Sequence, residues 1–150
     1  MRLRIVLLLA LLIGLFFTIS GNQRPVRRCI PEFAARRQAE KVVMPDYPSN
    51  TDSTVSKAVV LAAVLFDERG KMVKANVYES PGPEFAEAVT RALEQWKLTL
   101  VYDSTGRPVE TKTAIRFHFI FEDGKGRVEA ASVDEQMGPR DSAKVCNTGL

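Results

Sequence analysis

One apolar stripe, in the stretch Pro83 to Leu98, constrains the fold more than any other feature of the sequence. The stripe recurs at i, i+4, i+7, i+8 and i+11, which is the spacing of one helix face. Its members are Phe85, Val89, Ala92, Leu93 and Trp96. Gly82 suits the N-cap, and Pro83 suits the first helical position, where its missing N–H has no partner to lose. The sequence therefore predicts an amphipathic helix whose apolar face must cover another layer.

Two runs rich in β-branched residues precede this helix, and a third follows it. Val55 to Phe66 and Met72 to Glu79 are joined by Asp67 to Gly70, a turn sequence that predicts a β-hairpin. Thr111 to Phe121 shows the clearest alternation in the chain. Ile115, Phe117, Phe119 and Phe121 fall on one face, and Lys112, Arg116 and His118 fall on the other. The order predicts an α+β fold: a small antiparallel sheet (β-β-α-β) with one helix packed on one face.

The first 21 residues have the character of a targeting segment. Arg2 and Arg4 precede the run Ile5 to Phe17, which has no polar side chain and is shorter than the roughly 20 residues of a spanning helix. Residues 1–21 are therefore either a signal peptide cleaved after Ser20 or a short membrane anchor, and the rest of the chain is exported. Without the two arginines, the chain has nineteen basic and eighteen acidic side chains. This nearly balanced charge does not indicate a nucleic-acid partner.

The remaining sequence divides into a linker, a domain and a tail. Residues 22–44 are expected to be a linker with a short helix from Glu32 to Val43, residues 45–126 the domain, and residues 127–150 a C-terminal tail. Cys29 and Cys146 lie outside the predicted core, near opposite ends of the chain. In an oxidising compartment they either form a disulfide that closes a long loop or remain apart.

No group of residues in the sequence predicts enzyme activity, a metal site or a cofactor. His118 is the single histidine, and a metal or a catalytic base needs further ligands or a partner that the pattern does not supply. It is therefore interpreted as an exposed strand residue. Trp96 belongs to the helix stripe and is interpreted as a core residue. The sequence contains neither a Gly-rich phosphate loop nor a Cys-x-x-Cys pair.

Residues from Tyr47 to Phe121 carry a resemblance to the C-terminal domain of the TonB family. Its elements, in order, are Tyr47-Pro48, the turn Asp67 to Gly70, Ser80-Pro81-Gly82, Ala92-Leu93 with Trp96-Lys97-Leu98, and Gly106-Arg107-Pro108-Val109 before the strand that ends at Phe121. The chain departs from the family pattern at Phe85-Ala86 and at Leu100. The apolar segment has no histidine, and a long Pro-rich linker is absent, whereas energy-transducing members have both.

The resemblance implies an exported module of the cell envelope, in the periplasm or on the inner membrane, that binds a protein or peptide partner and is linked to transmembrane transport. It implies β-augmentation, the addition of a partner strand, at the edge formed by the last strand. The candidate partner-binding residues are Thr111, Thr113, Ile115, Arg116, Phe117, His118 and Phe119. An energy transducer for outer-membrane receptors ranks third, because the membrane histidine and the linker are missing.

The second-ranked function is a structural envelope protein, and it follows from the first strand. This strand is apolar on both faces, and the predicted helix covers only one of them. The second face consists of Val59, Leu61, Ala63 and Leu65. Its cover is the segment Glu32 to Val43, the tail after Gly126, a second copy of the chain or a partner. A second copy would make the protein a homodimer.

Overall fold

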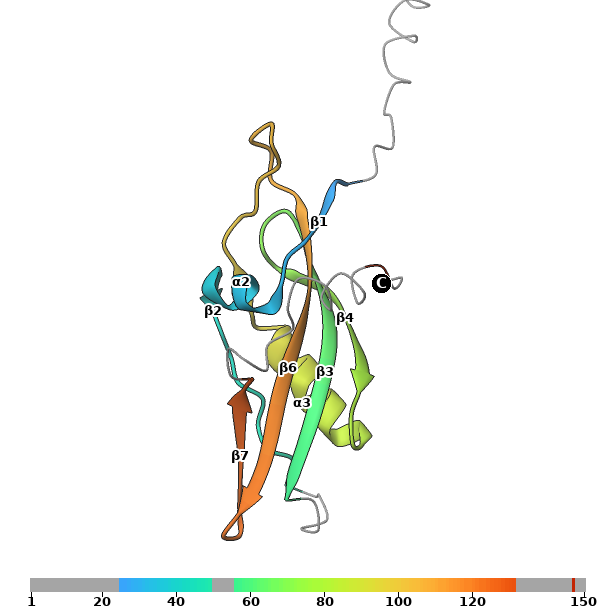
Figure 1. The fold of residues 1–150 in the computed structure, drawn as a ribbon, viewed down its shortest axis with the longest axis vertical. Helices are drawn as coiled ribbons and strands as arrows, with labels where there is room; N and C mark the ends of the chain where they lie inside the picture. The colour runs from blue at the N-terminus through green and yellow to red at the C-terminus, as the bar shows by residue number, and fades with distance from the viewer. Residues whose placement is uncertain (1–24, 50–55, 132–146, 148–150) are drawn as a thin grey trace, which may run out of the picture.

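The computed structural model describes residues 25–49, 56–131 and 147, and places most of them around one twisted sheet. The strands are β1 (Arg27–Cys29), β2 (Ala39–Lys41), β3 (Lys57–Phe66), β4 (Met72–Glu79), β5 (Lys97–Leu98), β6 (Glu110–Glu122) and β7 (Lys125–Ala130). The helices are α2 (Glu32–Arg37) and α3 (Pro83–Leu93). The architecture is the predicted α+β fold, with the hairpin, the helix α3 and the long strand β6 in the predicted order (Figure 1).

The sheet has the order β1-β6-β3-β4, and β7 also pairs with β6. Strands β3 and β6 run antiparallel from the pair Lys57–Ile120 to the pair Phe66–Thr111, so they form the long centre of the sheet (Figure 1). Strand β1 is parallel to β6, whereas β4 and β7 are antiparallel to their neighbours. A small second sheet joins β2 to β5.

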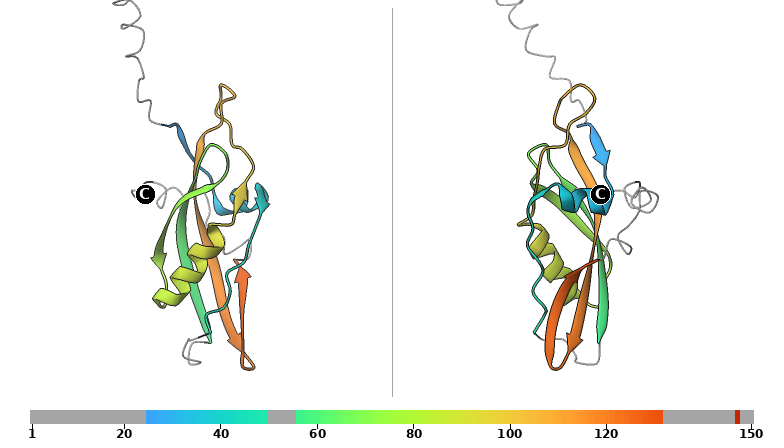
Figure 2. Two further views of the ribbon diagram at one scale, coloured as in Figure 1. Left: turned by 180° about the vertical axis from the view of Figure 1, so that it is seen from behind. Right: turned by 60° about the vertical axis from the view of Figure 1, so that its left-hand side comes forward.

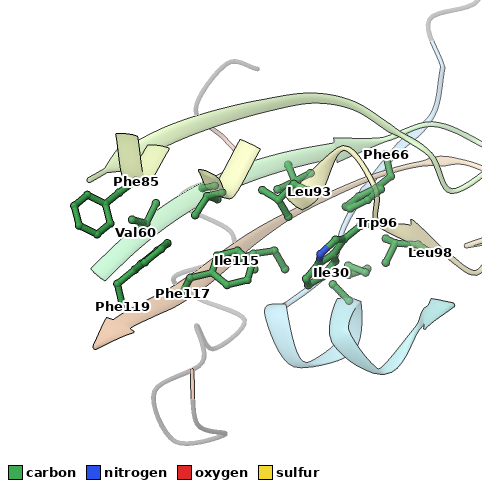
Figure 3. Close-up of a cluster of buried hydrophobic side chains, with 14 of the residues drawn as sticks. Ile30, Val60, Phe66, Phe85, Leu93, Trp96, Leu98, Ile115, Phe117 and Phe119 are labelled. Atoms are coloured by element: carbon green, nitrogen blue, oxygen red, sulfur yellow. The ribbon is translucent and has the colours of Figure 1, made fainter. Parts of the chain in front are cut away.

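Helix α3 crosses one face of the sheet and buries the predicted stripe (Figure 2). Figure 3 shows Phe85 and Phe119 at one end of this core, and Trp96, Leu98 and Ile30 at the other. The helix ends at Leu93, five residues before the predicted end. The Gln95 and Trp96 N–H groups bond to the carbonyls of Ala92 and Leu93, three residues back, and the chain then becomes strand β5. The pairing of β5 with β2 overrides the continued helical pattern, and Trp96 is buried beyond the helix.

The segment expected to be a linker is part of the domain. It contributes β1, α2 and β2, and Ile30 and Ala35 are buried in the main core. The predicted helix from Glu32 to Val43 ends at Arg37, because the chain then turns into β2 and Ala39 pairs with Leu98. The targeting segment 1–21 lies outside the described residues.

The second face of the sheet is buried. Leu61 and Leu65 are 6% and 5% exposed, and Ala63 is fully buried. The segment from α2 to Val43 lies with α3 on the opposite face, where Ala35 and Val43 join the main core. It is therefore not the cover of the second face. The tail was predicted to begin at residue 127, but its first residues belong to β7 and pair with β6. Beyond Ala131, the tail lies outside the described residues, except for residue 147.

Gly70 closes the β3–β4 turn and approaches the backbone of Leu98. Its φ is +75°, and a Cβ built there would overlap the Leu98 carbonyl oxygen, whereas the Leu98 N–H donates to the Gly70 carbonyl. Gly106 has a similar φ of +78° but nothing within 4 Å of such a Cβ. Alanine at Gly106 would therefore cost stability through backbone conformation alone. Alanine at Gly70 would add the overlap with Leu98.

We expect Gly70→Ala to lower the free energy of unfolding by about 2 kcal/mol or more, because conformational strain and overlap add together. Gly106→Ala should cost only about 1 kcal/mol, from conformation alone. Urea unfolding followed by circular dichroism measures both. Equal losses would show that the Gly70–Leu98 approach does not constrain the fold.

Candidate partner-binding edge

Strand β6 has two backbone edges, and the one that faces away from β3 is called the outer edge of β6. From the sequence, Thr111 to Phe121 was predicted to be the edge strand of the sheet. The structure corrects this, because β1 pairs with Glu110 to Lys112 and β7 pairs with Phe117 to Glu122 on the outer edge. Among the described residues, Thr113 to Arg116 are paired with no strand on that edge.

The residues from Val26 to Arg37, called the N-terminal arm, cover the first half of the outer edge. The Val26 carbonyl accepts from the Glu110 N–H at 3.1 Å, and the Ile30 N–H donates to the Lys112 carbonyl at 3.0 Å. Arg27 and Glu110 add an ion pair of 3.0 Å at the surface. Pro31 then turns the chain out of the sheet direction, with φ −68° and ψ 158°, and α2 begins. The arm thus makes a short parallel strand followed by a helix.

Two side chains of α2 meet β6 at Arg116, where strand pairing has stopped. The Arg116 N–H donates to Glu32 Oε1 at 3.0 Å, and Arg36 Nη2 donates to the Arg116 carbonyl at 2.8 Å. Glu32 Oε1 also accepts from Arg36 Nε at 2.9 Å and from Nη2 at 2.7 Å. This set is called the Glu32–Arg36 clamp. It occupies the N–H and C=O groups that an added strand would use.

The i,i+4 spacing places Glu32 and Arg36 on the same side of α2. Glu32 is fully buried, and such a carboxylate needs several charge-assisted hydrogen bonds to offset its desolvation. The Arg36 guanidinium carbon lies 5.7 Å from the Trp96 ring centroid and 5.4 Å from that of Phe117, so the cation also stacks on two core rings. The sequence did not single out either side chain, because both lie in the segment predicted to be a linker. Their signal was a Glu–Arg pair four residues apart on an alanine-containing helix.

Most of the predicted site residues have buried side chains. Thr111, Thr113, Ile115, Phe117 and Phe119 are buried, and the last three belong to the main core. His118, expected to be an exposed strand residue, is only 7% exposed. Because these side chains are not accessible, a partner at the outer edge would meet the backbone of β6 rather than its side chains.

Lys112 is also buried, contrary to the expectation of a solvated charged face. Burial lowers the pKa of the Lys112 amine, and the neighbouring Tyr78 hydroxyl opposes that shift. Lys112 thus lies on a covered face, next to Leu65 of β3 in the sheet, whereas Arg116 is half-buried.

Cys29 lies at the end of β1 and is disulfide-bonded. Cys146, the other cysteine of the sequence, lies outside the described residues, so the pairing of Cys29 with Cys146 stays a prediction. Within 25–49 and 56–131, no three His, Cys, Asp or Glu side chains are grouped to hold a metal ion. None of the helices in the described part of the chain has the length and apolar character needed to cross a membrane.

The sequence is similar to one known protein family. The family model of the Gram-negative bacterial TonB protein C-terminal matches residues 43–121, which is more than half of the chain. The chain belongs to the TonB C-terminal family. The match includes β6 and α3 but begins after β2, so the N-terminal arm lies outside it. No curated protein matches the chain.

Family membership agrees with the resemblance noted in the sequence. TonB C-terminal domains are periplasmic domains of Gram-negative bacteria that interact with proteins such as outer-membrane receptors, and the family is one of protein interaction and energy transduction rather than enzymes. The chain is a TonB-like envelope protein. The Tyr47 of the Tyr47-Pro48 pair packs against the rings of Phe85, Phe119 and Phe121, which explains why this element accompanies the fold.

Proposed function

We propose that this TonB-like protein binds an extended segment of an envelope protein by strand addition at the outer edge of β6. The observation that supports the proposal is that this edge already accepts added strands, β1 in parallel and β7 in antiparallel orientation. Between them, Thr113 to Arg116 pair with no strand of the described residues on this edge, and the Arg116 backbone bonds to side chains of α2. Strand addition would use main-chain hydrogen bonds for affinity.

Self-association through the second face of the sheet, the alternative of a structural envelope protein, is less well supported. Leu61 and Leu65 are buried within a single chain, so they offer little apolar surface to a second copy. Energy transduction to outer-membrane receptors remains third, because the sequence lacks a histidine in Ile5 to Ile19.

A proline at Arg116 tests the proposed edge. The Arg116 N–H faces Glu32 rather than β3, so Arg116→Pro removes an outer-edge donor without removing a bond of the β3–β6 ladder. With the domain as bait in affinity capture from envelope extract, Arg116→Pro should abolish capture of a partner that the wild type retains. Arg116→Ala, which keeps the N–H, should retain capture within about threefold.

Circular dichroism must show that the proline variant is folded. Capture by a folded Arg116→Pro protein at wild-type level would place the partner elsewhere on the molecule.

For location, we propose that the targeting segment is removed and the protein acts in the periplasm. Thr18 and Ser20 are small enough for a cleavage site after Ser20. Mass spectrometry of protein made in a Gram-negative host should show an N-terminus near Gly21. Recovery of intact Met1 in the membrane fraction would instead indicate an inner-membrane anchor and revive the transducer alternative.

A further inference from the structure

The N-terminal arm pairs with the outer edge of β6 over fewer positions than the other strands of the sheet do with their neighbours. Strand β1 has three residues, all of them exposed, whereas β3 and β6 pair over ten positions. Helix α2 has six residues and begins at Pro31 without a side-chain cap. Such short elements are stabilised by tertiary contacts rather than by their own hydrogen bonds. Among the strands that pair with β6, β1 therefore has the shortest backbone ladder to break when the arm leaves.

The arm reproduces on β6 the contacts of an added strand. Val26 and Ile30 supply a carbonyl and an N–H in parallel register, and after Pro31 the Glu32–Arg36 clamp supplies an acceptor and a donor to Arg116. In side view, α2 lies between the levels of β1 and β7 (Figure 2). A second extended segment cannot bond the N–H and carbonyl of Arg116 while the clamp holds both.

The arm also covers apolar surface that a strand alone would leave exposed. Ile30 and Ala35 belong to the core cluster, and Arg36 lies over the rings of Trp96 and Phe117. Figure 3 shows Ile30 next to Trp96 and Leu98 in this part of the core. A segment that replaces the arm would therefore need an aliphatic side chain for the position of Ile30, as well as an extended backbone.

We propose that the N-terminal arm is an internal competitor that occupies the partner site, and that a partner strand pairs with Thr113 to Arg116 only when the arm is displaced. This inference rests on the proposed function, because it concerns the same edge. Only the molecules whose arm is released can bind a partner. The apparent dissociation constant is therefore the intrinsic constant divided by the released fraction. The partner class is an extended segment that enters parallel to β6, as β1 does, and carries an aliphatic residue.

A synthetic copy of the arm tests the competition without a known partner. The probe is a fluorescein-labelled peptide of residues 24–38, with serine in place of Cys29, and a peptide of scrambled order controls for its basic charge. The full chain is compared as wild type, Glu32→Gln and Pro31→Gly. Glu32→Gln weakens the clamp but keeps an acceptor, and Pro31→Gly loosens the arm by backbone entropy without removing a buried group. Glu40→Gln, which alters a surface ion pair with Lys97, is the matched control.

Fluorescence anisotropy should show that Glu32→Gln and Pro31→Gly bind the peptide at least about tenfold more tightly than the wild type and Glu40→Gln. The scrambled peptide should show no such difference. In the wild type, hydrogen exchange should be faster at the Arg116 amide than at the β6 amides that bond to β3. This second measurement needs no variant, so it holds even where one of the substitutions unfolds the chain.

Equal peptide affinity in all four proteins, or an Arg116 amide as slow as the β3–β6 ladder, would show that the arm is a fixed part of the fold and would overturn the inference. The proposed function would survive that result if Arg116→Pro still abolished capture from envelope extract. Conversely, tighter peptide binding by the released variants with no sensitivity of capture to Arg116→Pro would support the arm as an occupant and refute the proposed partner site.

Discussion

Trp96→Ala is expected to lower the free energy of unfolding by about 3–5 kcal/mol, the range for truncation of a large buried aromatic side chain. Trp96 is only 2% exposed, and its Nε1–H donates to the Val43 carbonyl at 2.8 Å. Its ring also meets Phe117 edge to face at 6.1 Å between centroids. The substitution therefore removes packing between the core and the segment before β3 as well as a partly buried hydrogen bond. A domain of this size has only roughly 5–15 kcal/mol of stability.

Trp96→Phe is the matched control, because it keeps an aromatic ring but cannot bond to the Val43 carbonyl. It should lose about 1–2 kcal/mol, mostly from the unmade hydrogen bond and the smaller ring. Guanidinium unfolding followed by circular dichroism measures both variants. A loss below about 1 kcal/mol for Trp96→Ala would mean that the side chain is not a core residue.

Leu61→Lys should lower the free energy of unfolding by about 3 kcal/mol or more, because it removes a buried leucine and places an ammonium group on a covered face. Leu61 is 6% exposed and packs with Ala114. Val59 lies on the same face but is only half-buried, so Val59→Lys is the control; its ammonium can reach water, and the loss should be smaller.

The same variant separates a covered face from a dimer interface. Size-exclusion chromatography of the wild type should give a monomer at all concentrations, with Leu61→Lys destabilised. A wild-type dimer that Leu61→Lys converts into a stable monomer would show instead that a second copy covers the face.

The sequence alone predicted the elements whose apolar residues recur with a strong period. The stripe of Phe85, Val89 and Leu93 predicted α3, and the alternation of Ile115, Phe117 and Phe119 predicted the core face of β6. The turn at Gly70 was also predicted, because a positive φ there requires glycine. These elements are local, so their pattern is visible without knowledge of what packs against them.

The rest depended on contacts between distant parts of the chain. Three-residue strands such as β1 carry no periodic signal, and β1 exists because it pairs with residues more than 80 positions away. The end of α3 was misplaced for the same reason, since β5 is fixed by β2 and by Gly70. The candidate site on β6 stays a prediction. Its covering by the arm and by the clamp of Glu32 and Arg36 could not be inferred from a segment that resembles a linker.

Hydrogen exchange on the complex with the captured partner tests the central claim most directly. Strand addition with displacement of the arm predicts slower exchange at the outer-edge amides of β6, including Arg116, together with faster exchange in the N-terminal arm from Val26 to Arg37. The control is β4, whose exchange should not change. Protection confined to β4, or protection of β6 with an unchanged arm, would contradict the account.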